Sequence, residues 1–182
     1  MAAVAESMMD VVDDYMSTDA LDDKSEDVES VQFDFDESYQ ARIAALCMRD
    51  KNFMKRVAHL IQPGYFDALA DKILVGIALQ HFEKYDGVLA DPSVIKMALS
   101  DAIKRREIRD DEKSVVISRV KELSKLAIDN PDYAVEKVAT FAKRQAIEIA
   151  MTKSIDFFEK GDFDRVEQLM EQAFKVGEKA NG

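Results

Sequence analysis

The residues best suited to catalysis or metal binding are few and lie far apart in this sequence. It contains two histidines, His59 and His81, and one cysteine, Cys47. A closed structural zinc site requires more cysteine and histidine ligands than these residues supply. Both histidines stand beside apolar residues in helical patterns, and Cys47 falls on a predicted apolar helix face, where it fits a small buried hydrophobic residue. We therefore predict that the chain has no metal site.

Motifs for nucleotide chemistry are absent from the sequence. No glycine precedes a lysine, so there is no P-loop, and no Gly-x-Gly fingerprint for a dinucleotide occurs. The many carboxylates include no pair on an otherwise apolar face that would serve as general acid and base. We predict no catalytic residues and no bound cofactor. A small helical enzyme that uses His59 or His81 is a distant alternative, since no base, nucleophile and orienting group come together.

Two basic clusters were weighed as nucleic-acid contacts. The run Lys104-Arg105-Arg106, followed by Arg109, falls in a predicted connection where acidic residues dilute its charge. Lys143-Arg144 falls inside a long predicted helix. Neither cluster alternates with aromatic residues, as a platform for single strands would require. The pattern favours a solvated connection and leaves contact with DNA open.

The negative charge of the chain is concentrated at its start. The formal net charge is −11, yet residues 1–36 hold twelve acidic residues and one lysine, so the remainder carries 24 residues of each sign. High acidity and low apolar content predict that residues 1–35 form a disordered tail. Within it, apolar residues between Met8 and Met16 recur at helical spacing, which leaves open a short segment that folds on a partner.

The rest of the chain shows apolar periodicity typical of α-helices, with few glycines and prolines to interrupt it. Three sites have the residues that commonly begin a helix. Asp36 is a capping residue, and in Asp91-Pro92 and Asn130-Pro131 a capping residue is followed by proline at the first helical position. A helix from about Asp67 to Tyr85 has a broad apolar face, which predicts a central position for it and a core around Ile73 and Ile77. We predict an all-α fold, with a compact helical head over residues 36–129.

The predicted head is followed by a protruding antiparallel helical hairpin over residues 130–182. Its two helices run from Pro131 to about Lys160 and from Asp162 to about Lys179, and Gly161 stops the first helix. The apolar residues of this pair spread over more than one helix stripe, so two helices cannot hide them from each other. We predict that the hairpin is a self-association surface, with these residues in the contact: Phe141, Ile149, Phe157, Phe158, Phe163, Val166 and Met170. The alternative is that the head folds back and covers the apolar residues of the hairpin.

Nothing in the sequence suggests a membrane protein. No segment approaches the roughly 20 consecutive apolar residues that a membrane span requires, and the N-terminus lacks a signal-peptide pattern. A lone cysteine fits a reducing compartment. We therefore predict a cytoplasmic protein with no membrane partner.

The order of these elements over residues 36–178 resembles the N-terminal domain of DnaB-type hexameric replicative DNA helicases, in particular the phage versions. The resemblance lies in packing and capping positions, and no catalytic motif contributes to it. Those positions are the short helix ending at Ile61, then Pro63, Tyr65-Phe66, Ile73, Ile77, Phe82, Tyr85, Asp91-Pro92-Ser93, Tyr133, Val138 and Phe141–Ala146. The acidic tail departs from the pattern of that family.

The resemblance implies an assembly domain. In that family the hairpins pair two by two, and three pairs form a hexameric collar above a ring of RecA-like motor domains, which bind ATP and Mg²⁺. The collar docks primase and, in some systems, a helicase loader. By resemblance, this chain would pair with itself, dock a primase or loader, and support DNA unwinding by a motor domain outside residues 1–182. If a phage encodes it, the predicted location is the host cytoplasm. The alternative is a stand-alone helical adaptor of a replisome that binds helicase or primase.

Overall fold

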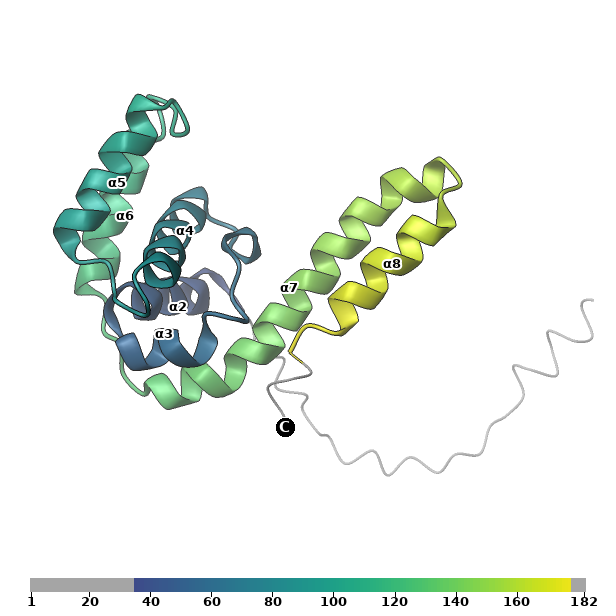
Figure 1. Ribbon diagram of the computed structural model, residues 1–182, viewed down its shortest axis with the longest axis horizontal. Helices are drawn as coiled ribbons and strands as arrows, with labels where there is room; N and C mark the ends of the chain where they lie inside the picture. The colour runs from purple at the N-terminus through teal and green to yellow at the C-terminus, as the bar shows by residue number, and fades with distance from the viewer. Residues whose placement is uncertain (1–34, 178–182) are drawn as a thin grey trace, which may run out of the picture. The chain divides into compact units, whose positions relative to one another are not determined.

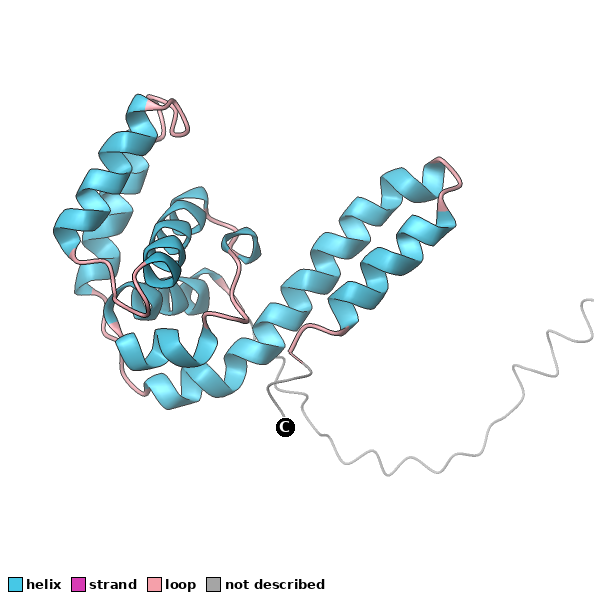
Figure 2. Cartoon of the chain, viewed as in Figure 1, coloured by secondary structure: helices cyan, strands magenta, loops and turns pink. Residues whose placement is uncertain are grey.

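The computed structural model describes residues 35–177, and the expected all-helical fold is confirmed for them. They form seven α-helices and one short 3₁₀ helix, with no β-strand in this part of the chain (Figure 2). The helices are α2 (Glu37–Arg49), α3 (Lys51–Val57), η1 (Pro63–Tyr65), α4 (Leu69–Lys84), α5 (Pro92–Lys104), α6 (Lys113–Lys125), α7 (Pro131–Glu159) and α8 (Phe163–Phe174). The prediction for residues 1–34 lies outside the described residues.

Several helices begin where the capping residues predict. The carboxylate of Asp36 accepts a hydrogen bond from the backbone N–H of Tyr39 at 2.8 Å. Asp91 caps α5 by accepting from the N–H groups of Ser93 and Val94 at 2.8 and 3.0 Å. These bonds satisfy N–H groups that have no partner inside the helix, which fixes the starts of α2 and α5.

The core of the head is built around α2, which packs against α4 and α6 (Figure 1). Ile43, Leu46 and Cys47 of α2 are fully buried. The prediction that Ile73 and Ile77 form the core is wrong, because both are only partly buried on α4. The neighbouring residues Leu74, Val75 and Ala78 face the core instead and are at most 1% exposed.

The first half of α7 belongs to the same core. Ala134, Val138, Phe141 and Ala142 are 0–1% exposed, and this part of α7 packs against α3 and η1. The Phe141 ring contacts the rings of Phe35, Tyr39 and Phe66, with centroids 5.5, 5.7 and 5.8 Å away. Head packing therefore extends about three helical turns beyond residue 129, and Phe35, assigned to the tail from sequence, is part of it.

The second half of α7 lies beside α8 (Figure 1). The turn between them is a Schellman motif: the N–H of Gly161 donates to the Phe158 carbonyl at 3.0 Å, and that of Asp162 to the Phe157 carbonyl at 2.9 Å. Gly161 has φ +73°, a conformation that glycine adopts without a Cβ clash. Beyond α8, a Cβ on Gly177 would stand 3.2 Å from the Ala139 carbonyl oxygen, so the chain runs close against α7 there.

No helix within residues 35–177 combines the length and the apolar character needed to cross a bilayer.

Candidate interaction surfaces

Exposed apolar side chains gather along the α7–α8 pair. Met151, Ile155 and Phe158 are 59%, 58% and 64% exposed, and their spacing of four and three residues places them on one face of α7. Phe163 and Phe174 of α8 are 61% and 48% exposed and stand eleven residues apart, also on one face of their helix. The rings of Phe158 and Phe163 touch, with centroids 5.7 Å apart, so the two rows meet at the turn. We call these five residues the apolar stripe.

The structure corrects one residue of the predicted self-association surface. Phe141 is fully buried in the aromatic cluster of the head and has no surface with which to contact a second molecule. It lies 17 residues before Phe158 on the same continuous helix, in the half of α7 that the head covers. The prediction placed all of α7 in the hairpin, whereas at Phe141 the alternative holds, in which the head covers the apolar residue.

Of the other six predicted residues, two are exposed and four are partly buried. Phe158 and Phe163 belong to the apolar stripe. Ile149 is partly buried on another side of α7, where it borders a small cavity with Phe66 and Gly64 of the head. The remaining three, which are Phe157, Val166 and Met170, are partly buried.

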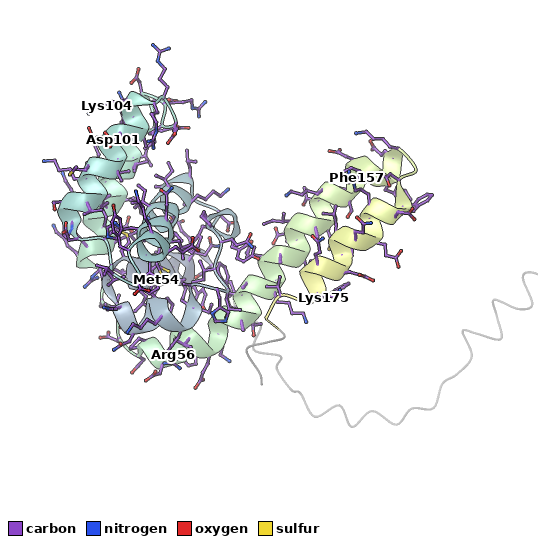
Figure 3. The ribbon with its side chains drawn as sticks, viewed as in Figure 1. Met54, Arg56, Asp101, Lys104, Phe157 and Lys175 are labelled. Atoms are coloured by element: carbon purple, nitrogen blue, oxygen red, sulfur yellow. The ribbon has the colours of Figure 1, made fainter. Side chains whose placement is uncertain are left out.

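Phe157 lies near the end of α7, close to the turn (Figure 3). The guanidinium of Arg165 stands 5.5 Å from the centre of its ring, a distance that suits a cation–π contact between α7 and α8. Phe157 therefore serves the packing of the two helices on each other, and Phe158 is the exposed member of this pair of adjacent phenylalanines.

A second surface, which the sequence analysis did not find, is a groove in the head. It has a volume of about 770 Å³ and lies between α5 and α6, next to the C-terminal end of α2. We call it the α5–α6 groove. Its apolar lining comes from these residues: Met48, Ala90, Pro92, Ile95, Leu99, Ile103, Ile117 and Val120. The amphipathic patterns of α5 and α6 could have indicated this groove. Only the fold, however, shows that the apolar faces of the two helices are separated and not in full contact.

The charged residues that line the α5–α6 groove all have the same sign. They are Arg49, Lys96, Lys104 and Lys121, and no acidic residue stands among the lining residues of the described chain. The Arg49 guanidinium donates to the carbonyls of Leu123 and Leu126 at 3.0 and 2.6 Å, so it also closes the C-terminal end of α6. Lys96 and Lys121 are exposed at the rim.

The basic cluster in the connection between α5 and α6 is matched by acids. Arg105 forms a hydrogen-bonded ion pair with Glu107 at 2.8 Å, and Arg109 with Glu112 at 2.6 Å. Lys104, at the end of α5, stands 3.6 Å from Asp101 (Figure 3). The hydrogen bond and the charge of Glu107 raise the pKa of Arg105 above its ordinary value. These local pairs support the interpretation of a solvated connection.

The two histidines and the cysteine do not share a site. Cys47 is fully buried in α2, His59 is exposed after α3, and the His81 ring stacks on Tyr85 with centroids 4.4 Å apart. No group of three or more metal-binding side chains is found among residues 35–177. The structure therefore brings none of the three together.

We expect Cys47 to resist alkylation in the folded chain. Burial raises the pKa of its thiol to about 12, so the reactive thiolate is scarce at pH 8. Iodoacetamide should label the folded chain at least ~100-fold more slowly than the chain in denaturant. Mass spectrometry reports Cys47 without ambiguity because it is the single cysteine. Equal labelling rates in the two states would contradict its buried position.

Searches against models of protein families, curated proteins and solved structures found no match to this chain.

Proposed function

We propose that this chain is the N-terminal assembly and docking domain of a DnaB-type replicative helicase. In this role it pairs with copies of itself, contributes to a collar, and docks a primase or helicase loader, while a separate motor domain unwinds DNA. The alternative is a stand-alone replisome adaptor that binds helicase or primase. Both functions depend on protein contacts rather than on chemistry within residues 35–177.

The observation that carries the proposal is the apolar stripe. Its five side chains are 48–64% exposed, although burying the exposed part of each would be favourable by roughly 1–2 kcal/mol. Exposed apolar residues that share a helix face and meet across a turn, as Phe158 and Phe163 do, are typical of protein interaction sites. Three of the five are phenylalanines, and a few aromatic anchors commonly supply most of the binding energy of an interface.

A symmetric pair would cover this surface efficiently. Two copies related by a twofold axis place the same stripe on both sides of the contact, so that each contact between two different residues occurs twice in the interface. The α7–α8 pairs of the two copies would then form a four-helix contact, which is a common way to bury amphipathic helices. Because the stripe lies on the half of α7 that packs beside α8, the head does not cover it.

The test is sedimentation of the full chain at tens of micromolar and moderate salt. We expect the wild type to associate, and Phe158→Asp to raise the dissociation constant by about 30-fold or more, because the contact would then bury an unpaired charge. Met97→Asp is the matched control, since Met97 is 67% exposed on α5, away from the stripe. It should associate like the wild type. A wild type that stays monomeric, or a Phe158→Asp variant that associates equally well, would refute the pairing.

A different observation distinguishes the helicase domain from the stand-alone adaptor. A reading frame that continues into a Walker-type P-loop favours the helicase domain. If the frame instead stops, the adaptor is favoured, and binding of the full chain to a separate helicase or primase becomes the next measurement.

A further inference from the structure

We propose that the α5–α6 groove binds an α-helix of a partner protein that is apolar on one face and acidic at its flanks. The inference goes beyond the proposed function and does not rest on it. The groove is formed by α5, α6 and the end of α2, whereas the apolar stripe lies on α7 and α8.

The shape of the groove suits a helix. Along α5 its wall is made by residues spaced three and four apart from Pro92 to Lys104, a length of about 18 Å or roughly three helical turns. Ile117, Val120 and Lys121 of α6 line the opposite side. A groove of about 770 Å³ between two helices has the form in which an amphipathic helix lays side chains at positions i, i+3 or i+4, and i+7.

The apolar part of the binding energy comes from the exposed residue of the groove wall. Met48, Ile95 and Leu99 are 5–8% exposed, so they join the groove to the head core and have little surface left to bury. Ile117 stands at the wall and is 48% exposed, so a partner helix would remove much of its side chain from water. Burial of such surface is the main favourable contribution when helices dock in grooves.

The charges around the groove determine which helix fits. Lys96 and Lys104 line it from α5 and Lys121 from α6, so both walls carry positive charge. With no acid in the lining, a partner with basic flanks would meet like charges and be rejected, whereas acidic flanks would be attracted from both sides. Lys104 also pairs with Asp101, but both side chains are more than half exposed, and exposed pairs of this kind are weak.

The probe is a synthetic peptide of about four helical turns, with leucines at positions i, i+4 and i+7 and glutamates beside them. We expect fluorescence anisotropy to show saturable binding to the full chain, with weaker binding at high salt because the charged contacts are screened. A peptide with lysines in place of the glutamates should bind at least ~10-fold more weakly. No binding by the acidic peptide, or equal binding by the basic peptide or by a scrambled acidic one, would overturn the proposal.

Variants of the chain locate the binding. Ile117→Asp should weaken binding of the acidic peptide at least ~10-fold, and so should Lys96→Glu combined with Lys121→Glu. The matched controls are Val115→Asp and Lys125→Glu, which change exposed residues of α6 outside the groove lining. They should alter binding less than ~2-fold. Equal effects in the controls would place the contact elsewhere.

The experiment also separates this proposal from the pairing of α7 and α8. Phe158→Asp should leave peptide binding unchanged, because Phe158 is remote from the groove lining. If sedimentation instead shows that Ile117→Asp abolishes self-association, a second copy of this chain occupies the groove, and the proposal of a partner helix is wrong.

Discussion

Asp71→Ala should lower the free energy of unfolding by about 3–5 kcal/mol. The carboxylate of Asp71 is fully buried in α4, and both of its oxygens accept hydrogen bonds from Arg119 of α6, at 2.7 and 2.8 Å. Arg119 is itself buried and also donates to Glu122 at 2.9 Å. The Asp71 hydrogen bonds raise the pKa of Arg119 above its ordinary value. Without Asp71 the guanidinium still carries its charge and keeps only its exposed partners Glu122 and Glu37.

The expected loss reflects a buried charge that has lost its buried partner, and not the net strength of the Asp71–Arg119 pair. Replacing both partners by apolar residues, as in Asp71→Leu with Arg119→Met, removes the charge as well and should cost less than Asp71→Ala alone. Asp101→Ala is the control for an exposed pair, because Asp101 and Lys104 are 57% and 73% exposed. It should cost less than ~1 kcal/mol.

Urea unfolding followed by circular dichroism at 222 nm measures all three variants. The measurement is best made at low micromolar concentration, where self-association contributes little to the apparent stability. An Asp71→Ala variant that is no less stable than Asp101→Ala would contradict the structural importance of the buried pair.

Local signals in the sequence predicted the helices well. Capping residues such as Asp36 and Asp91 act through bonds to N–H groups two or three residues away, so their effect is visible in a short window. The glycine stop at Gly161 is equally local. The Asp71–Arg119 pair was not predicted, because its partners are 48 residues apart and only the packing of α4 on α6 brings them together.

The interaction surfaces were harder to predict for the same reason. The apolar residues of α7 show that the helix must be covered on several sides, but periodicity does not say which part is covered by the head and which by another molecule. Phe141 and Phe158 lie on the same helix, yet Phe141 is fully buried and Phe158 is 64% exposed. The α5–α6 groove depends on the separation of two helices, a tertiary property that no single helical pattern contains.

The two phenylalanines of α7 therefore give a direct comparison within one helix. Phe141→Ala should lower the free energy of unfolding by about 3–5 kcal/mol, because it removes a fully buried ring and leaves a cavity among its neighbours. Three aromatic rings, those of Phe35, Tyr39 and Phe66, lie within 5.8 Å of it, centre to centre, and they would lose their contacts together.

Phe158→Ala makes the same chemical change at a position that is 64% exposed, so the isolated chain should lose less than ~1 kcal/mol. Thermal unfolding at low micromolar concentration distinguishes the two variants, since each kcal/mol corresponds to a shift in melting temperature of about 2–4 °C for a domain of this size.

Raising the protein concentration to tens of micromolar adds a second comparison. If the stripe pairs two copies, the wild type and Phe141→Ala should gain stability with concentration, and Phe158→Ala should gain less. If the two alanine variants lose equal free energy of unfolding at low concentration, the boundary of the head along α7 is not the one that the burial of its residues indicates.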